Sequence, residues 1–169
     1  MGLLDKFLNR TSSKADLGYM SARQSAFNKQ VSDLKNVTPE EISNVYGAVV
    51  DMHISENIAT LICFADGTAN LHYSNGHSTT GLGEKYGDIR NTVITFISNA
   101  EKVLPSMALT KSFELPQDSQ TVVYLISRMG IYTISYDVNR PSSISSDSKY
   151  LNMLVQNVLT RIRTRLQKD

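Results

Sequence analysis

The feature that most constrains the fold is the stretch of residues 57–65, which is apolar on both sides of an extended chain. Because successive side chains of a strand point to opposite faces, Ile62 and Phe64 lie on one face of this stretch and Leu61 and Cys63 on the other. A strand with two apolar faces has to be covered on both. The stretch therefore predicts a sheet with helices packed on each side.

Runs rich in Val, Ile, Thr and Tyr predict six strands in two groups of three. Asp66-Gly67 separates the second strand from the third, and its tolerance of positive φ predicts a type I′ hairpin turn. Short links between the last three strands predict an antiparallel meander, with turns at residues 116–119 and at Met129-Gly130. The predicted strands cover residues 47–54, 57–65, 68–74, 107–114, 120–128 and 131–138.

Helices are predicted before, between and after the two groups of strands. Ser21 and Gln24 have the spacing of a capping box, which predicts a helix start. Thr38 and Glu41 repeat this spacing, with Pro39 at the first helical position. Apolar residues at three- and four-residue intervals predict two longer helices. The predicted helices cover residues 22–35, 39–46, 84–104 and 147–167.

These elements predict an α+β fold, with a central, mostly antiparallel sheet of five or six strands and helices on both faces. Residues 37–169 are expected to form this single domain. Residues 1–36 are expected to contribute an N-terminal amphipathic segment, a flexible joint and a helix.

The charge distribution is uneven along the 169 residues, although the net charge is only +1. Counting Lys and Arg against Asp and Glu gives +3 for residues 1–36, −6 for residues 37–148 and +4 for residues 149–169. A total near zero provides no broad cationic surface for a phosphate backbone, so we expect no nucleic-acid partner. With 41% hydrophobic and 20% charged residues, the composition is that of a globular protein.

The N-terminal residues 2–10 can form a short amphipathic helix with Leu3, Leu4, Phe7 and Leu8 on one face. So short a helix is not stable alone in water. Three surfaces could cover its apolar face: the protein's own domain, a partner, or a membrane. One short segment with few basic residues would bind a membrane only weakly.

The expected compartment is the cytoplasm. The single cysteine, Cys63, lies in an apolar run, which indicates a buried thiol and a reducing environment. The first residues lack the continuous apolar region of a signal peptide, and no apolar stretch is long enough to span a membrane.

Residues 76–83 contain candidate anion-binding groups between a predicted strand and a predicted helix. Gly76 and Gly81 have the separation of the two glycines of a phosphate-binding loop, but Leu82 and Gly83 stand where that loop needs Lys and then Ser or Thr. Backbone N–H groups near a helix start still attract anions. The candidate ligand-binding residues are Gly76, Ser78, Thr79, Gly81 and Gly83.

Catalytic and metal-binding signals are weak. His53, His72 and His77 match no metal-ligand spacing, and no Gly-x-Ser-x-Gly motif occurs. Arg161, Arg163 and Arg165 are expected at a solvated helix end. We therefore predict no catalytic residue, no metal and no cofactor.

The order of predicted elements over residues 38–169 resembles roadblock (dynein light chain) and longin domains, which belong to the profilin-like architecture. The segments Ala48-Val49-Val50-Asp51-Met52 and Ala65-Asp66-Gly67-Thr68-Ala69, followed by Gly76 and by Gly81-Leu82-Gly83 before a helix, also resemble a group of short uncharacterised bacterial proteins. The roadblock resemblance implies a domain without catalytic residues that dimerises by joining sheet edges and packing helices. It also implies protein partners such as a small GTPase or a scaffold.

The sequence thus predicts a non-enzymatic protein-interaction or regulatory module that forms a homodimer. The alternative is a small module that binds an anionic ligand, or a cryptic enzyme, through residues 76–83.

Overall fold

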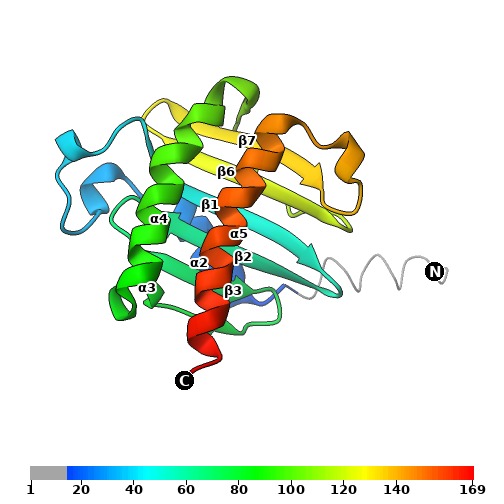
Figure 1. The fold of residues 1–169 in the computed structure, drawn as a ribbon, viewed down its shortest axis with the longest axis horizontal. Coiled ribbons are helices and arrows are strands. Elements are labelled where there is room, and N and C mark those ends of the chain that lie inside the picture. Colours follow the sequence, from blue (N-terminus) through cyan, green and yellow to red (C-terminus); the bar gives the residue numbers. More distant parts are fainter. Residues whose placement is uncertain (1–14) are drawn as a thin grey trace.

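A computed structural model describes residues 15–169, which form one antiparallel sheet flanked by helices (Figure 1). The strand order across the sheet is β4-β3-β2-β1-β6-β7-β5, and each neighbouring pair is antiparallel. The strands are β1 (Val45–Ile54), β2 (Asn57–Phe64), β3 (Ala69–Tyr73), β4 (Ser78–Thr79), β5 (Ala108–Thr110), β6 (Gln120–Ser127) and β7 (Gly130–Asp137).

Helices lie on both faces of this sheet. In Figure 1, α4 and α5 run side by side in front of the sheet, while α2 lies behind it. Four short 3-10 turns accompany these helices in the described residues. The helical elements are α2 (Leu17–Asn28), η1 (Val31–Asp33), η2 (Pro39–Glu41), α3 (Leu82–Lys85), α4 (Gly87–Ala100), η3 (Glu101–Ser106), η4 (Pro141–Ser143) and α5 (Ser146–Leu166).

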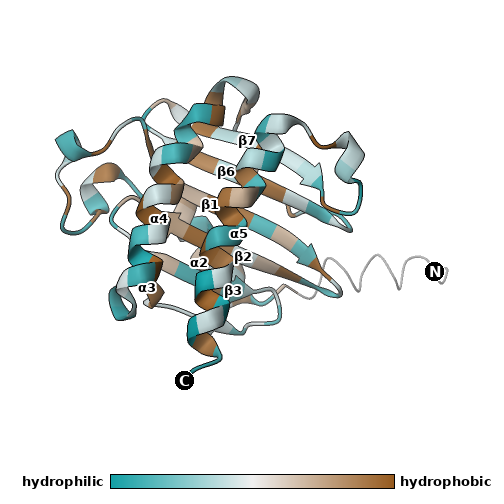
Figure 2. Ribbon diagram, in the orientation of Figure 1, coloured by the Kyte–Doolittle hydropathy of each residue, from teal (hydrophilic) through white to brown (hydrophobic). Residues whose placement is uncertain are grey.

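The two apolar faces predicted from residues 57–65 are covered as expected. Leu61 and Cys63 join the larger buried cluster, between the sheet and α4 and α5. Ile62 and Phe64 join a smaller cluster with Phe27 of α2. Figure 2 shows hydrophobic residues along the central strands and hydrophilic residues at the strand ends and in the loops. Burying both faces of the sheet is the main stabilising contribution to the fold.

The α+β class and the antiparallel sheet are confirmed, but the sheet has seven strands rather than five or six. The additional strand is β4, which falls in the predicted loop of residues 76–83. Its two residues pair with Leu71 and His72 of β3. A two-residue strand is too short to produce an alternation of apolar and polar residues, so the sequence pattern does not reveal it.

The hairpin at Asp66-Gly67 is confirmed, but its turn is not type I′. Gly67 has φ of 87°, whereas Asp66 is absent from the residues with positive φ that a type I′ turn requires. The Gly67 N–H donates to the Phe64 carbonyl and the Phe64 N–H donates to the Thr68 carbonyl. The loop therefore has three residues and ends on a left-handed glycine.

The predicted meander of the last three strands is wrong. β5 pairs with β7 at the edge of the sheet, and β6 lies between β1 and β7. β6 is buried on both faces, with Leu125 in one apolar cluster and Tyr124 in the other, whereas Leu109 of β5 is 60% exposed. A doubly apolar strand gains most at the centre of a sheet and an exposed one belongs at its edge.

The first predicted helix is misplaced. α2 begins at Leu17 instead of residue 22, because the side chain of Asp16 accepts a hydrogen bond from the Tyr19 N–H and caps it. Ser21 and Gln24 therefore lie inside α2 and do not mark its start, and the buried stripe of α2 contains the charged residue Arg23. The chain leaves the α-helix at Asn28 and forms the separate turn η1.

The remaining helix predictions hold in part. The capping box of Thr38 and Glu41 is present, but the helix that it starts is only the three-residue turn η2. The helix predicted over residues 39–46 therefore ends early, and β1 starts at Val45. The helix predicted over residues 84–104 is divided into α3, α4 and η3, while α5 matches the last prediction and is capped by Ser145.

Candidate functional site

Helices α4 and α5 form an antiparallel pair that is hydrogen-bonded at both ends. At one end, the Arg165 side chain lies 3.0–3.2 Å from the two carboxylate oxygens of Asp88. At the other, the Tyr150 hydroxyl lies 3.4 Å from Oδ1 of Asn99. Their inner sides pack on the sheet, so only the outer sides are available to a partner.

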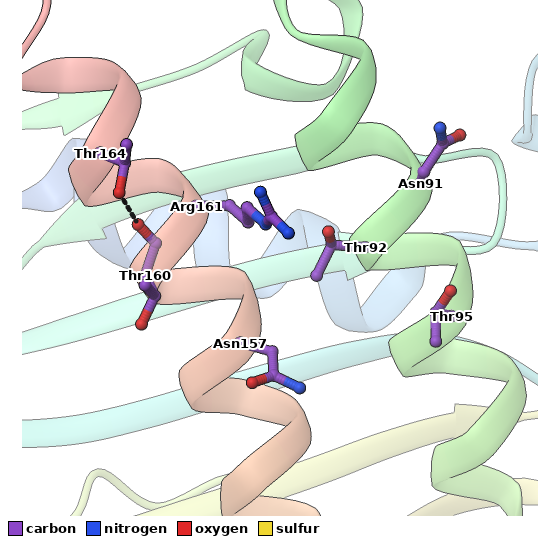
Figure 3. Close-up of a pocket in the computed structure, with 7 residues that line it drawn as sticks. All are labelled: Asn91, Thr92, Thr95, Asn157, Thr160, Arg161 and Thr164. Carbon is purple, nitrogen blue, oxygen red and sulfur yellow. Dashed lines mark hydrogen bonds between the residues drawn. The ribbon is translucent and has the colours of Figure 1, made fainter.

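A groove of about 510 Å³ runs between the outer sides of the two helices. Six of its seven lining side chains are uncharged amides and hydroxyls, and the seventh is Arg161, which extends from α5 toward α4 (Figure 3). Thr164 donates to the Thr160 carbonyl, as the dashed line shows. The lining residues are Asn91, Thr92, Thr95, Asn157, Thr160, Arg161 and Thr164.

The helices around this groove carry a long charge-free stretch. Residues 91–99 and 150–160 contain no Asp, Glu, Lys or Arg, in a chain with 20% charged residues. Two apolar side chains are also exposed there, Ile94 at 37% and Met153 at 48%. Interface cores are depleted of charged residues and rimmed by polar ones. We refer to the exposed residues of these two stretches, with the groove, as the helical face.

The apolar spacing from which these two helices were predicted marks their buried stripes, so it does not reveal the helical face. The absence of charge over residues 91–99 and 150–160 was a readable signal, since an exposed helix surface normally carries charges of both signs. Of the three arginines expected at a solvated helix end, Arg165 pairs with Asp88 and Arg161 lines the groove. Arg161 and Arg163 are both exposed, as expected.

A buried polar network joins α2 to the face of the sheet that α2 covers, opposite α4 and α5. The Arg23 guanidinium donates to Oδ2 of Asp51 through Nε at 3.0 Å and Nη2 at 2.6 Å. Thr60 donates to Oδ1 of the same carboxylate at 2.6 Å, and its hydroxyl lies 2.8 Å from that of Tyr19. Within residues 15–169, every buried side-chain polar atom has a hydrogen-bond partner, so this network is fully satisfied.

The electrostatics of the network follow from its burial. Burial acts to lower the pKa of the Arg23 guanidinium, but hydrogen bonding to Asp51 outweighs it and raises that pKa above its usual value. Burial raises the pKa of Tyr19 to about 12. Both side chains therefore keep their protons throughout the physiological range. This network has the geometry of a structural anchor for α2, because Arg23 and Asp51 are almost wholly removed from solvent.

The five residues predicted to bind an anion lie in one hairpin and the short helix that follows it. Ser78 and Thr79 form β4, and Gly76 occupies the preceding turn with φ of 97°. The Gly81 N–H donates to Oδ1 of Asn70 at 2.9 Å. A Cβ on Gly83 would lie 1.8 Å from the Gly67 carbonyl oxygen, so this glycine permits close packing of α3 on the hairpin. Anion binding here stays a prediction.

The histidines and the cysteine occupy separate environments. His53 Nε2 lies 3.3 Å from the exposed Asp118 carboxylate, and burial lowers the pKa of His72. His77 is exposed in the turn before β4. Cys63 is fully buried, and desolvation raises its pKa well above the usual range. Among residues 15–169, no group of three or more His, Cys, Asp or Glu side chains could hold a metal ion.

The N-terminal contact residues Leu3, Leu4, Phe7 and Leu8 lie outside the described residues. In the described part of the chain, no helix has both the length and the apolar composition that crossing a bilayer requires.

The edges of the sheet are short. β4 has two residues at one edge, and β5 has three at the other. Very short edge strands are one of the ways in which proteins limit edge-to-edge pairing. The two edge strands themselves therefore offer few backbone groups, and the expected dimerisation through sheet edges stays a prediction.

These observations define an α+β protein built on one seven-stranded antiparallel sheet, with a face on its α4–α5 pair in which residues 91–99 and 150–160 carry no charge. No protein-family model, no curated protein and no solved structure matches the chain. The resemblance to roadblock and longin domains rests on the order of the predicted elements, and it stays a prediction.

Proposed function

We propose that this protein is a non-enzymatic interaction or regulatory module that forms a homodimer through the helical face. The observation that carries the proposal is the absence of charged residues from positions 91–99 and 150–160, around exposed Ile94 and Met153. Apolar and uncharged polar groups cost less free energy to desolvate than charged groups when a second surface covers them. A solvated face of this size would normally carry several charges.

The helix dipoles favour an antiparallel two-fold arrangement of the helical faces. A two-fold axis in the plane of the face and perpendicular to the helices makes α5 antiparallel to the same helix of the second copy. The C-terminal end of α5, with Arg161 and Arg163, then lies toward the N-terminal end of the second copy's α5, whose first turn carries both Asp147 and Lys149. Opposite ends of the helix dipoles meet in this arrangement, whereas a parallel arrangement would place like ends together.

The proposed cellular role follows the roadblock and longin resemblance. A homodimer that presents paired sheets and helices is a platform for a further protein, such as a small GTPase or a scaffold. The proposed compartment is the cytoplasm, on the basis of the single buried thiol of Cys63.

The experiment is sedimentation equilibrium of the full chain and of the double variant Thr95→Glu/Asn157→Glu, which places a carboxylate on each side of the groove. We expect the wild type to be dimeric and this variant to dissociate with a dimer Kd at least about tenfold higher, which is about 1.4 kcal/mol. The matched control is Gln24→Glu/Ser25→Glu, because both residues are exposed on α2. This control should remain dimeric.

Two results would contradict the proposal. One is a wild-type chain that stays monomeric at every concentration. The other is a dimer that survives Thr95→Glu/Asn157→Glu but is lost in Leu109→Asp, since Leu109 is the exposed central residue of edge strand β5. Thermal unfolding of each variant confirms that its monomer remains folded.

A further inference from the structure

The outer edge of β7 is only half covered. β7 has eight residues, but β5 pairs only with Ile131, Tyr132 and Thr133. Residues 134–137 pair with β6 on their inner side and, within residues 15–169, have no strand on their outer side. By the same register Met107, the extended residue before β5, falls opposite Ile134, so the part of the edge without a neighbour is residues 135–137, which we call the half-edge.

The register identifies which backbone groups point outward. Successive residues of a strand direct their N–H and C=O groups to opposite sides. Ser127 and Gly130 pair across a two-residue turn, so Gly130 and every second residue after it direct their N–H and C=O groups toward β6. The intervening residues direct these groups outward, and β5 pairs with those at positions 131 and 133. The outward residues that remain are Ser135 and Asp137.

Three backbone groups are thus available on the half-edge. The Asp137 carbonyl accepts from the Arg140 N–H at 3.1 Å and is occupied. The Ser135 N–H, the Ser135 carbonyl and the Asp137 N–H remain for a partner. They have the spacing of an antiparallel ladder, which an added extended strand would complete.

A groove of about 400 Å³ adjoins these groups. Residues of β7 from both faces of the sheet line this groove, Ile134 from the α5 side and Ser135 from the α2 side. The segment around Ile144 lines it as well. Ser135 is exposed. The groove therefore offers backbone partners along its floor and an apolar contact on one side.

We infer that this half-edge binds an extended peptide with alternating basic and apolar residues, which adds to the sheet as a short antiparallel strand. The acidic group of the half-edge is the Asp137 carboxylate, which can pair with a basic side chain of the peptide. Asp137 lies directly on the edge, and its partner Arg140 is 3.5 Å away and largely exposed. Arg140 can turn into solvent when a basic side chain approaches the carboxylate.

The side-chain pattern of the peptide follows from the register. Peptide residues opposite Ser135 and Asp137 direct their N–H groups to β7 and their side chains to the α2 side, where Asp137 lies. These are the basic positions. The residues between them direct their side chains to the α5 side, against Ile134 and Ile144, and are the apolar positions.

The test uses a fluorescein-labelled peptide in which Val-Lys is repeated four times, with anisotropy as the readout for the full-length protein. Ser135→Pro removes an outward N–H that β6 does not use, and edge positions of this kind tolerate proline. Its affinity should fall about tenfold or more, which exceeds the loss of one ordinary hydrogen bond because the ring also blocks the edge. Ser135→Ala keeps the N–H and should bind within about twofold of wild type.

Modified peptides give a second test that does not depend on how the variant folds. Methylation of the lysine backbone nitrogens should abolish binding, because these N–H groups face β7, whereas methylation of the valine nitrogens should preserve it. A Val-Glu repeat should bind more weakly than Val-Lys. The inference is overturned if wild type fails to bind Val-Lys, if Ser135→Pro binds it as well as Ser135→Ala does, or if both methylated peptides bind equally.

Discussion

Nη2 of Arg23 on α2 lies 2.6 Å from Oδ2 of Asp51 on β1, and the two side chains are 5% and 0% exposed. The guanidinium also lies 5.0 Å from the centre of the Phe27 ring, which belongs to the apolar cluster beneath α2. A buried ion pair of this kind adds little net stability compared with an apolar pair, but removal of one partner leaves a charge without compensation. The pair therefore specifies where α2 docks on the sheet.

Single substitutions in this pair should be strongly destabilising. We expect Arg23→Met to lower the free energy of unfolding by about 3–5 kcal/mol, because Asp51 keeps its burial and loses its cation. Urea denaturation followed by circular dichroism measures the change. The double variant Arg23→Met/Asp51→Leu should be more stable than Arg23→Met, since no charge is left buried. A double variant less stable than both singles would contradict this account.

Two glycines separated by four positions should respond in opposite ways to alanine. Gly83→Ala places a Cβ against the Gly67 carbonyl oxygen and should destabilise the fold by about 3 kcal/mol. A Cβ on Gly87 meets nothing within 4 Å, and Gly87→Ala should be neutral or stabilise by up to about 1 kcal/mol. Thermal unfolding compares the two variants. Equal effects would show that α3 does not contact the hairpin as described.

Asp66 should make the fold sensitive to acid. Burial acts to raise the pKa of its carboxyl, but hydrogen bonds from the Lys35 and Thr68 N–H groups outweigh it and hold the pKa below its usual range. A lowered folded-state pKa gives stability that is fully present above the unfolded-state value of about 4 and is lost as the pH falls through the folded-state value.

The free energy of unfolding of Asp66→Asn should therefore differ most from that of wild type at neutral pH, and the gap should narrow below about pH 4. Urea titrations at pH 7, 4 and 3 (values chosen to bracket that window) measure it. The control is Glu56→Gln, whose side chain is exposed in the β1–β2 turn. A constant gap between Asp66→Asn and wild type at all three values would exclude the proposed linkage.

Removal of residues 1–14 should leave the fold intact. Asp16 supplies the cap of α2, and its N–H donates to the Ser74 carbonyl at 2.8 Å, so the anchoring contacts of α2 begin after the deleted segment. Thermal unfolding of the truncated chain should match that of the full chain. Sedimentation with anionic vesicles then tests membrane contact by Leu3, Leu4, Phe7 and Leu8. A marked loss of thermal stability would indicate instead that these residues dock on the domain.

Cys63 should report global unfolding. Its thiol is fully buried and its pKa is raised by desolvation, so the reactive thiolate is scarce and inaccessible in the folded protein. We expect Ellman's reagent to react at the rate of unfolding, and faster in Arg23→Met than in wild type. Immediate reaction in native buffer would show that the sheet opens locally around β2.

The sequence by itself determined the elements whose signals are local. Alternation across residues 57–65, the Asp66-Gly67 hairpin and the capping box of Thr38 and Glu41 all depend on neighbours a few positions apart. The same holds for α5, whose apolar stripe identifies it. The charge-free stretches of the helical face were also readable, once the two helices were known to be exposed on one side.

Tertiary structure alone decided which strands became neighbours and which polar groups became partners. β5 lies at the edge of the sheet because β6, which is apolar on both faces, buries both of them only beside β1. The strand order therefore depends on the burial of whole strands. Arg23 lies in the buried stripe of α2, and its partner Asp51 lies 28 positions away on another element. The open half of β7 likewise results from the difference in length between two strands far apart in sequence. Such pairings depend on chain closure and burial over the whole molecule, which no local pattern records.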